Sequence, residues 1–308
     1  MPSKGYCQDT ANKYEDFGNP GAETPVVSLN EGWLKRKSWF GGSQWVDFAI
    51  NIHSDICTLR NYLPPNIKLE FILERNFDSF CLMGSPSERT TYHIDLENIH
   101  LTLDRIEPSA EVQKWYSDML RKGYKPRLEI DRSVIKTYTV TANKSDLSHY
   151  NIISGAQLPE QLIIGAVTEN SYNGTLNTNP YNFKDWNLIE GSLLVNGRHE
   201  PHELYRMNKD NKETADIWSQ FLNNTGVQND DREFGISKED YFGGCFLLAF
   251  DRTQDKCNRF HRHIMESGNI DVNLKTGTAL SETALVIIYG TYSTDLVIDG
   301  DTVIKYMF

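Results

Sequence analysis

The sequence has few cysteines and no long apolar run, and both shortages limit what the protein can be. Its 308 residues include five cysteines, an odd number without regular spacing, which favours a reducing compartment over a disulfide framework. No run of about 18 apolar residues is present, so no membrane-spanning helix is predicted. The first residues, MPSKGYCQDT, lack the apolar core of a secretory signal. We therefore expect intracellular synthesis without secretion.

Positive charge is also in short supply. Lys and Arg total 31 against 42 Asp and Glu, which gives a net charge of −11. An acidic balance of this kind argues against a protein that binds nucleic acid or anionic membranes through bulk charge. The stretch LKRKSWF (34–40) is a local exception. We predict neither a membrane partner nor direct sequence-specific contact with nucleic acid.

Familiar catalytic motifs are missing as well. The sequence contains no G-x-S-x-G, no P-loop and no G-x-G-x-x-G. HEPH (199–202) places two histidines beside Glu200, but Pro201 interrupts the helix that a zinc protease would need. The acidic residues of QNDDREFG (228–235) fit a solvated loop better than the paired carboxylates of a glycosidase. The sequence therefore predicts no catalytic residue, and we predict that the protein is not an enzyme.

Metal ligands in a usable pattern are absent too. Cys245, Cys257, His261 and His263 lie close together in sequence, but the cysteines are 12 positions apart and the histidines 2. A structural zinc site uses closely paired cysteines and histidines spaced three to five residues apart, roughly C-x2–4-C and H-x3–5-H. Cys245 lies in the apolar run CFLLAF, where a thiol behaves as a small core residue. We predict neither a metal nor a cofactor.

What the sequence does contain is β-strand patterning. Apolar and polar residues alternate in 45–53, 67–74 and 92–106, and Asn98 interrupts the last alternation as a β-bulge would. Further strands are predicted at 133–142, 161–167, 188–201 (ending in an Asn196-Gly197 turn), 244–250, 269–276 and 283–299. Amphipathic helices are predicted at 108–123 and 212–226. Long loops separate the strands instead of regular crossover helices, which favours an all-β sandwich.

The order of these patterns indicates two related units. A strand, a long turn, a second strand and a longer strand follow one another in 45–106 and again in 244–290. This echo predicts two similar sandwiches, of which the first is short of strands. The resulting division is a flexible arm, a partial first sandwich, a linker helix and a complete second sandwich, at residues 1–30, 31–107, 108–124 and 125–308.

One loop is unusually aromatic. The stretch YNFKDWN (181–187) carries Tyr181, Phe183 and Trp186. Aromatic residues in loops often anchor contacts between subunits. They also often fill a satellite of the core, and the pattern alone leaves both interpretations open. We treat the three as candidate subunit-interface residues.

A family resemblance runs through about residues 45–308. Its most specific block is QLPEQLIIGAVTENSYNGTLNTNPYNFKDWNLIEGSLLVNG, residues 157–197. The other stretches are HSDIC with RNYLPPNIKLEFILERNFDSFCLM (53–83), DRSVIKTYTV (131–140), ISKEDYFGGCFLLAFDRTQD (236–255) and GTALSETALVIIYGTYSTDLVID (277–299). Together they resemble the major capsid (hexon-like) proteins of Polinton/Maverick elements and adintoviruses.

The resemblance implies a fold and a role. It implies an all-β double jelly roll with a connecting helix, in which the first jelly roll is partial and the second complete. It also implies homotrimers that act as capsomers of an icosahedral virion, with minor capsid proteins as neighbours and no enzyme activity or cofactor. Family members carry a complete first jelly roll, whereas this chain begins near the middle of one. The resemblance therefore fits either a capsid subunit of a Polinton-like double-stranded DNA virus or an integrated remnant of its gene.

Two other classes of function stay open at this point. One is a jelly-roll enzyme, either a carbohydrate-active hydrolase or a metal-binding cupin. A cupin needs His and Glu clustered on adjacent strands, and no predicted strand offers H-x-H followed by Glu. The other is a binding module that a host has derived from a capsid protein.

Overall fold

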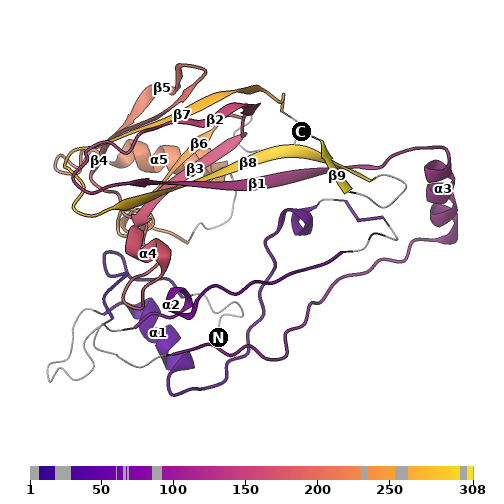
Figure 1. The fold of residues 1–308 in the computed structure, drawn as a ribbon, viewed down its shortest axis with the longest axis horizontal. Coiled ribbons are helices and arrows are strands. Elements are labelled where there is room, and N and C mark those ends of the chain that lie inside the picture. Colours follow the sequence, from indigo (N-terminus) through magenta and orange to yellow (C-terminus); the bar gives the residue numbers. More distant parts are fainter. Residues whose placement is uncertain are drawn as a thin grey trace.

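The computed structural model of the protein contains a sandwich of strands and, beside it, a region of helices and irregular chain (Figure 1). It describes residues 7–17, 29–59, 61–64, 67, 69–84, 92–229, 235–253, 263–298 and 304–307. Within these ranges every strand lies between Arg127 and Met307. The described chain before Arg127 therefore consists of helices and irregular segments, whereas the chain after it contains the strands.

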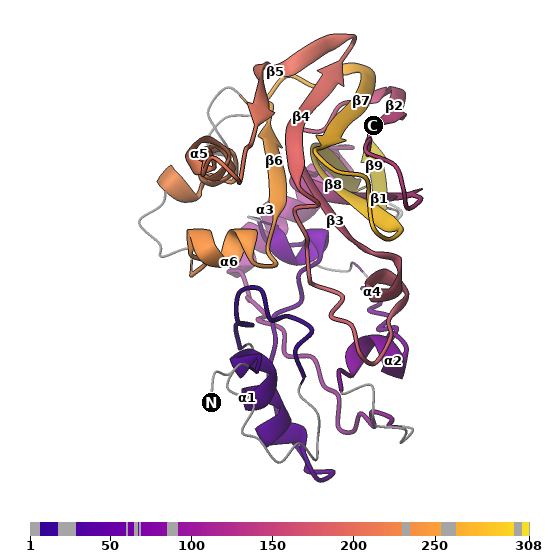
Figure 2. The same cartoon turned by 90° about the vertical axis from the view of Figure 1, so that its left-hand side faces the viewer.

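The strands form two antiparallel sheets that face each other (Figures 1 and 2). The first sheet has the order β1 (Arg127–Val140), β8 (Ala284–Ile298), β3 (Gln161–Thr168) and β6 (Leu247–Asp251), and β9 (Ile304–Met307) also pairs with β8. The second has the order β2 (His149–Gln157), β7 (Ser267–Thr276), β4 (Leu188–Val195) and β5 (Arg198–Arg206). The all-β sandwich predicted from the sequence is confirmed.

The pairing of these strands is nested. β1 pairs with β8, β2 with β7, β3 with β6 and β4 with β5, each pair antiparallel. This is the pattern of one long hairpin folded over into two sheets, which defines a jelly roll. The tip of the hairpin is the predicted turn, where Asn196 (φ 51°) and Gly197 (φ 78°) both take the positive φ that a type I′ turn requires. Residues 127–298 thus form the complete jelly roll.

The core of the sandwich follows from alternation along the strands. On β7, Ile270, Val272 and Leu274 are buried while the residues between them are not. Leu162 and Ile164 of β3 belong to the same buried cluster from the other sheet. Burying an aliphatic side chain of this size contributes about 1.5–3 kcal/mol, so this face supplies much of the stability.

Two helices lie along the edge of the sandwich that β5 and β6 form (Figure 2). In α5 (Ala215–Asn224), within the predicted 212–226, Ile217 and Phe221 are buried. In α6 (Lys238–Phe242), Tyr241 is fully buried and its hydroxyl donates to the Leu247 carbonyl at 2.7 Å. The rings of Trp218 and Phe221 lie 5.0 and 4.9 Å from that of Tyr241. These aromatic contacts fix both helices against the sheets.

The described chain from 29 to 126 contains helices but no strand. Its helices are α1 (Glu31–Phe40), the 3-10 turn η1 (Asp55–Thr58), α2 (Asp78–Cys81) and α3 (Ala110–Arg121). The strands expected at 45–53, 67–74 and 92–106 are therefore wrong in their described residues. Asn98, which interrupts the alternation, has a positive φ of 53°. No strand pairing surrounds it among the described residues, so it is not a β-bulge. An alternating segment becomes a strand only when a neighbouring strand pairs with its backbone.

The amphipathic helix predicted at 108–123 is confirmed and spans Ala110–Arg121. Ser109 caps it, since its hydroxyl accepts from the Val112 amide at 3.4 Å. None of its residues is buried. The division of the chain into an arm, a partial first unit, a linker and a second unit stays a prediction.

Candidate subunit-contact surface

Tyr181 lies on the surface, in the loop between α4 (Glu169–Asn173) and β4. Its side chain is 65% exposed. Its ring meets Phe80 of α2 edge-on, with centroids 6.5 Å apart. The contact joins the base of the sandwich to the helical region, and most of the ring remains open to a partner.

Phe183 fixes the same loop to the sandwich. Its amide donates to the Gly244 carbonyl at 2.8 Å, and its carbonyl accepts from the Phe246 amide at 3.1 Å. The half-buried ring fills the space above Gly165, where an added Cβ would come within 2.6 Å of it. The position of Phe183 thus depends on a glycine in β3.

Trp186 packs against the core of the sandwich. It is half-buried, and its indole nitrogen donates to the Ala166 carbonyl at 3.3 Å. Trp186 and Asn187 have φ of 50° and 51°, a conformation that costs a bulky residue energy and is kept only where packing enforces it. Of the three aromatic residues, Phe183 and Trp186 lie on the core side and Tyr181 outside. Their role in a subunit interface stays a prediction.

Charged side chains surround this loop. Lys184 forms an ion pair with Glu282 at 2.9 Å, and its ammonium lies 5.7 Å from the centre of the Trp186 ring. Lys209 forms an ion pair with Asp185, and burial lowers the pKa of Lys209. These ion pairs tie the loop to Glu282 and Lys209.

The segment 7–17, which no sequence pattern singled out, packs between α1 and the sandwich. Tyr14 is 6% exposed, and its hydroxyl lies 2.8 Å from the Cys245 sulfur. Its ring occupies the space left by Gly244, where a Cβ would approach within 2.4 Å. Phe17 is buried against Trp33, with ring centroids 5.5 Å apart. The sequence features that relate to this packing are two aromatic residues, Tyr14 and Phe17, in a polar arm, and the distant pair Gly243-Gly244.

Asn30 joins the same segment to α1. It is fully buried, and its side-chain oxygen accepts from the amides of Gly32 and Trp33 at 3.1 and 3.3 Å, as an N-cap does. The same oxygen accepts from the Thr10 amide at 3.2 Å. One side chain therefore caps the helix and holds the N-terminal segment.

Of the residues considered for metal binding, those that the structure describes do not come together in a site. Burial raises the pKa of the Cys245 thiol, although its hydrogen bond with Tyr14 acts in the opposite direction. Cys257 and His261 lie outside the described residues. His199 lies on β5, with its Nδ1 3.1 Å from the Ser192 hydroxyl. Among described residues, no group of three His, Cys, Asp or Glu side chains could hold a metal ion.

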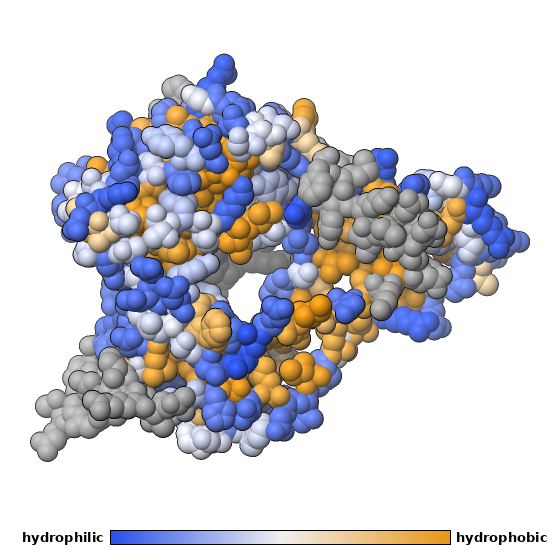
Figure 3. All heavy atoms as spheres, viewed as in Figure 1, coloured by the Kyte–Doolittle hydropathy of each residue, from blue (hydrophilic) through white to orange (hydrophobic). Residues whose placement is uncertain are grey.

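Many of the described exposed large apolar side chains lie in residues 45–107, which we call the extended layer. It exposes 13 large hydrophobic side chains: Trp45, Phe48, Ile50, Tyr62, Ile72, Leu73, Phe77, Tyr92, Leu96, Ile99, Leu101, Leu103 and Ile106. Figure 3 shows much of this lower region as apolar. A typical monomer leaves its largest apolar patch at roughly 300–600 Å². An apolar surface made of so many large side chains is typical of a protein that contacts another protein.

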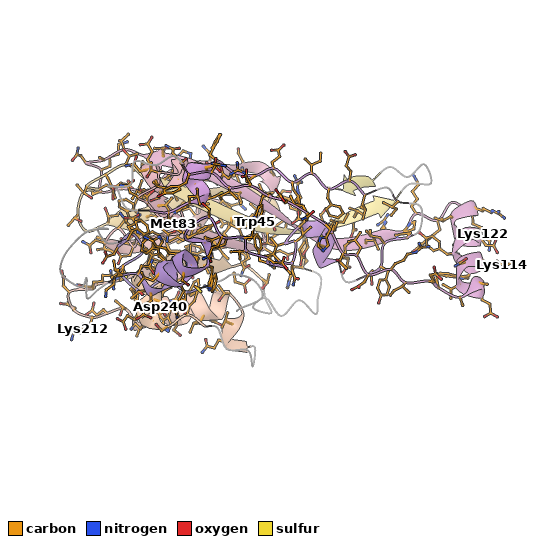
Figure 4. The ribbon with its side chains drawn as sticks, turned by 90° about the horizontal axis from the view of Figure 1, so that it is seen from below. Trp45, Met83, Lys114, Lys122, Lys212 and Asp240 are labelled. Carbon is orange, nitrogen blue, oxygen red and sulfur yellow. The ribbon has the colours of Figure 1, made fainter. Side chains whose placement is uncertain are left out.

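Helix α3 presents a second exposed apolar stripe. Val112 and Trp115 are 51% and 61% exposed and lie three positions apart, on one face. In Figures 1 and 4 the helix stands at one end of the molecule, away from the sheets. No helix in the described parts of the chain is long and apolar enough to cross a membrane.

Comparison with protein-family models gives no match, and comparison with curated proteins gives none either. Among solved structures, a chain of the Sputnik virophage at 3.5 Å is 15% identical, with a TM-score of 0.36, over 59% of this chain and 39% of that one. The VP54 protein of PBCV-1 fitted into a Sputnik reconstruction is 11% identical, with a TM-score of 0.40, over 65% and 54%. A quasi-atomic model of the PBCV-1 capsid is 11% identical, with a TM-score of 0.35, over 63% of this chain and 54% of that one. The chain spans 39–54% of the lengths of these proteins. The jelly roll described above is assigned from its strand pairing alone.

Proposed function

We propose that the protein is a structural subunit of a viral capsid, a hexon-like protein of a Polinton-like double-stranded DNA virus or its integrated remnant. The observation that carries this proposal is the nested strand pairing of residues 127–298. Four of the five stretches that resemble the capsid proteins lie in or beside this jelly roll, including the most specific one, 157–197. Because a fold alone does not fix a function, the combination of topology and resemblance is what supports the role.

Self-association is the partner interaction that the proposal requires. A shell subunit must offer surface to other copies of itself, and the extended layer offers apolar surface that no described strand covers. We propose a homotrimer as the first assembly and a capsid lattice with minor capsid proteins as the second. The number three comes from the family resemblance. The protein would then reside in the virion and carry out no catalysis.

The purified full-length chain tests this proposal. We expect sedimentation at tens of micromolar to give a trimer, and electron microscopy of concentrated protein to show ring-shaped or shell-like particles. A chain that stays monomeric at these concentrations would exclude the capsomer role.

The loop aromatic residues provide a sharper version of the test. Tyr181→Ala removes an exposed ring, so it should weaken assembly and leave the melting temperature nearly unchanged. Trp186→Ala removes a ring that packs on the core, so it should lower the melting temperature of the chain. Unchanged assembly in Tyr181→Ala would place the interface elsewhere.

A further inference from the structure

We propose that a cavity between the N-terminal segment 7–17 and the base of the sandwich binds a neutral sugar, as a single unit or a short oligosaccharide. The proposal goes beyond the shell-forming role and does not depend on it. The cavity, which we call the arm cavity, has a volume of about 670 Å³. Small-molecule sites usually measure roughly 300–1,000 Å³, so the arm cavity is large enough for such a ligand.

The walls of the arm cavity come from parts of the chain that are far apart in sequence. They are residues 12–16, residues within 182–186, residues 242–244, Lys209 and residues 281–282. The Asn12 amide donates to the Gly243 carbonyl at 2.7 Å, and Figure 2 shows the N-terminal segment beside α6. The cavity is therefore formed by the docking of the N-terminal segment and not by the sandwich alone.

The charges of the lining nearly cancel. The arm cavity is lined by three lysines and four carboxylates, a net charge of −1. Lys184 forms its ion pair with Glu282 at 2.9 Å, and Lys209 forms one with Asp185. A site for phosphate or another anion needs an excess of cations that are free to meet the ligand. The lining therefore favours a ligand without net charge.

Several polar side chains of the lining are left to meet a ligand. Within the described chain, the side chains of Lys13, Asp16, Asn182 and Ser281 form no hydrogen bond or ion pair. Asp16 and Asn182 are also half-buried. Together the four provide ammonium and amide donors, carboxylate and amide acceptors, and a hydroxyl that does both. Sugar hydroxyls both donate and accept, and they must find partners when water is excluded, so this mixed set suits them.

Two aromatic side chains complete the lining. Trp186 and Phe242 are half-buried, and the paired ammonium groups of Lys184 and Lys209 each lie 5.7 Å from the centre of one ring. An aromatic ring offers a flat apolar surface. A sugar ring has C–H groups on its faces and hydroxyls around its rim, so it can use both kinds of lining at once. A purely apolar ligand would leave the polar side chains without partners.

The binding test uses the wild-type full-length chain and a panel of neutral oligosaccharides built from glucose, galactose, mannose or N-acetylglucosamine. We expect isothermal titration calorimetry to detect binding of at least one of them. In saturation-transfer NMR, the strongest signals should come from the C–H protons of one sugar face, because that face would lie against the aromatic rings. Inorganic phosphate, the anionic probe, should not compete.

Two variants locate the binding in the arm cavity. Asp16→Ala should weaken binding about tenfold, as expected for loss of a hydrogen bond to a charged group, and Asn182→Ala should weaken it about three- to tenfold. Neither side chain has a partner within the described chain, so the melting temperature should change little. The matched controls are Asp104→Ala and Asn51→Ala, which change exposed residues of the extended layer outside the lining and should leave binding unchanged.

Each outcome decides the proposal. Binding that both cavity variants weaken and both controls preserve supports it. Binding that the cavity variants preserve places the sugar elsewhere and overturns it. It is also overturned if no sugar binds at about 10 mM, roughly tenfold above a weak dissociation constant of about 1 mM. Displacement of the sugar by phosphate would mean that the site takes anions instead. The shell-forming role is tested separately, by sedimentation, and stands or falls without these results.

Discussion

Residues 127–298 and residues 45–107 carry the same kind of pattern with opposite results. Both alternate apolar and polar residues. In the first region each strand has a hydrogen-bonded neighbour, and side chains such as Leu193 and Ile270 are fully buried. In the second region no described strand forms, and Ile99 and Leu103 are 65% and 61% exposed. Alternation therefore predicts which face of a segment would be buried in a sheet. Whether that face is buried depends on whether another strand is available to pair with the segment.

Limited proteolysis of the full-length chain tests the difference between the two regions most directly. We expect the first cuts within residues 45–107, because chain without ladder hydrogen bonds opens easily. A resistant product should retain residues 125–308, which we propose as an independently folding unit. Early cuts inside the sandwich, or a resistant fragment made of residues 31–107, would reverse the comparison. Mass spectrometry of the products decides between these results.

A matched pair of leucines sharpens the contrast. Leu193→Ala removes a fully buried side chain from β4 and should lower the free energy of unfolding by about 2–5 kcal/mol. Leu103→Ala removes a side chain that is 61% exposed and should change it by less than about 0.5 kcal/mol. Chemical denaturation measures both. Similar losses for the two variants would mean that the extended layer packs as tightly as the sandwich.

Sequence reasoning succeeded where the strands are regular. It placed β3, β7 and β8 to within two residues, together with both amphipathic helices and the Asn196-Gly197 turn, and it found β1 but began it six residues late. It missed β2, whose ladder with β7 shifts register on both sides of Ile153 and whose Asn151 and Gly155 have positive φ. Those irregularities break the period of two on which the prediction depends.

The errors in the first third have a different cause. The segments 45–53, 67–74 and 92–106 have good strand patterns, but pairing is a property of two segments and not of one. The packing of Tyr14 on Gly244 joins residues 230 positions apart, and no local pattern encodes such a contact. For the aromatic loop, the sequence named Tyr181, Phe183 and Trp186 together but did not separate the exposed ring from the two that face the core.

The N-terminal segment 7–17 joins α1 to the sandwich, and a pair of glycine substitutions tests that link. Gly244→Ala puts a methyl group into the Tyr14 ring at a φ of 145°, so it should cost more stability than Gly197→Ala, whose φ is also positive but which has nothing within 4 Å. The difference should be about 1–3 kcal/mol, the cost of overpacking. Thermal denaturation of both variants gives the answer. Equal losses would mean that Tyr14 does not occupy this space.

The smallest effect is expected at the hydroxyl of the same tyrosine. Tyr14→Phe keeps the buried ring and removes the contact of its hydroxyl with the Cys245 sulfur at 2.8 Å. A net loss of about 0.5–1.5 kcal/mol is expected, because that is the usual contribution of one hydrogen bond. Cys245→Ala and the double variant complete a cycle that isolates the pair from the rest of the packing. If the two losses simply add, the hydroxyl and the thiol do not interact, and the N-terminal segment is held to the sandwich by the ring and by its other hydrogen bonds, such as that from the Asn12 amide to the Gly243 carbonyl at 2.7 Å.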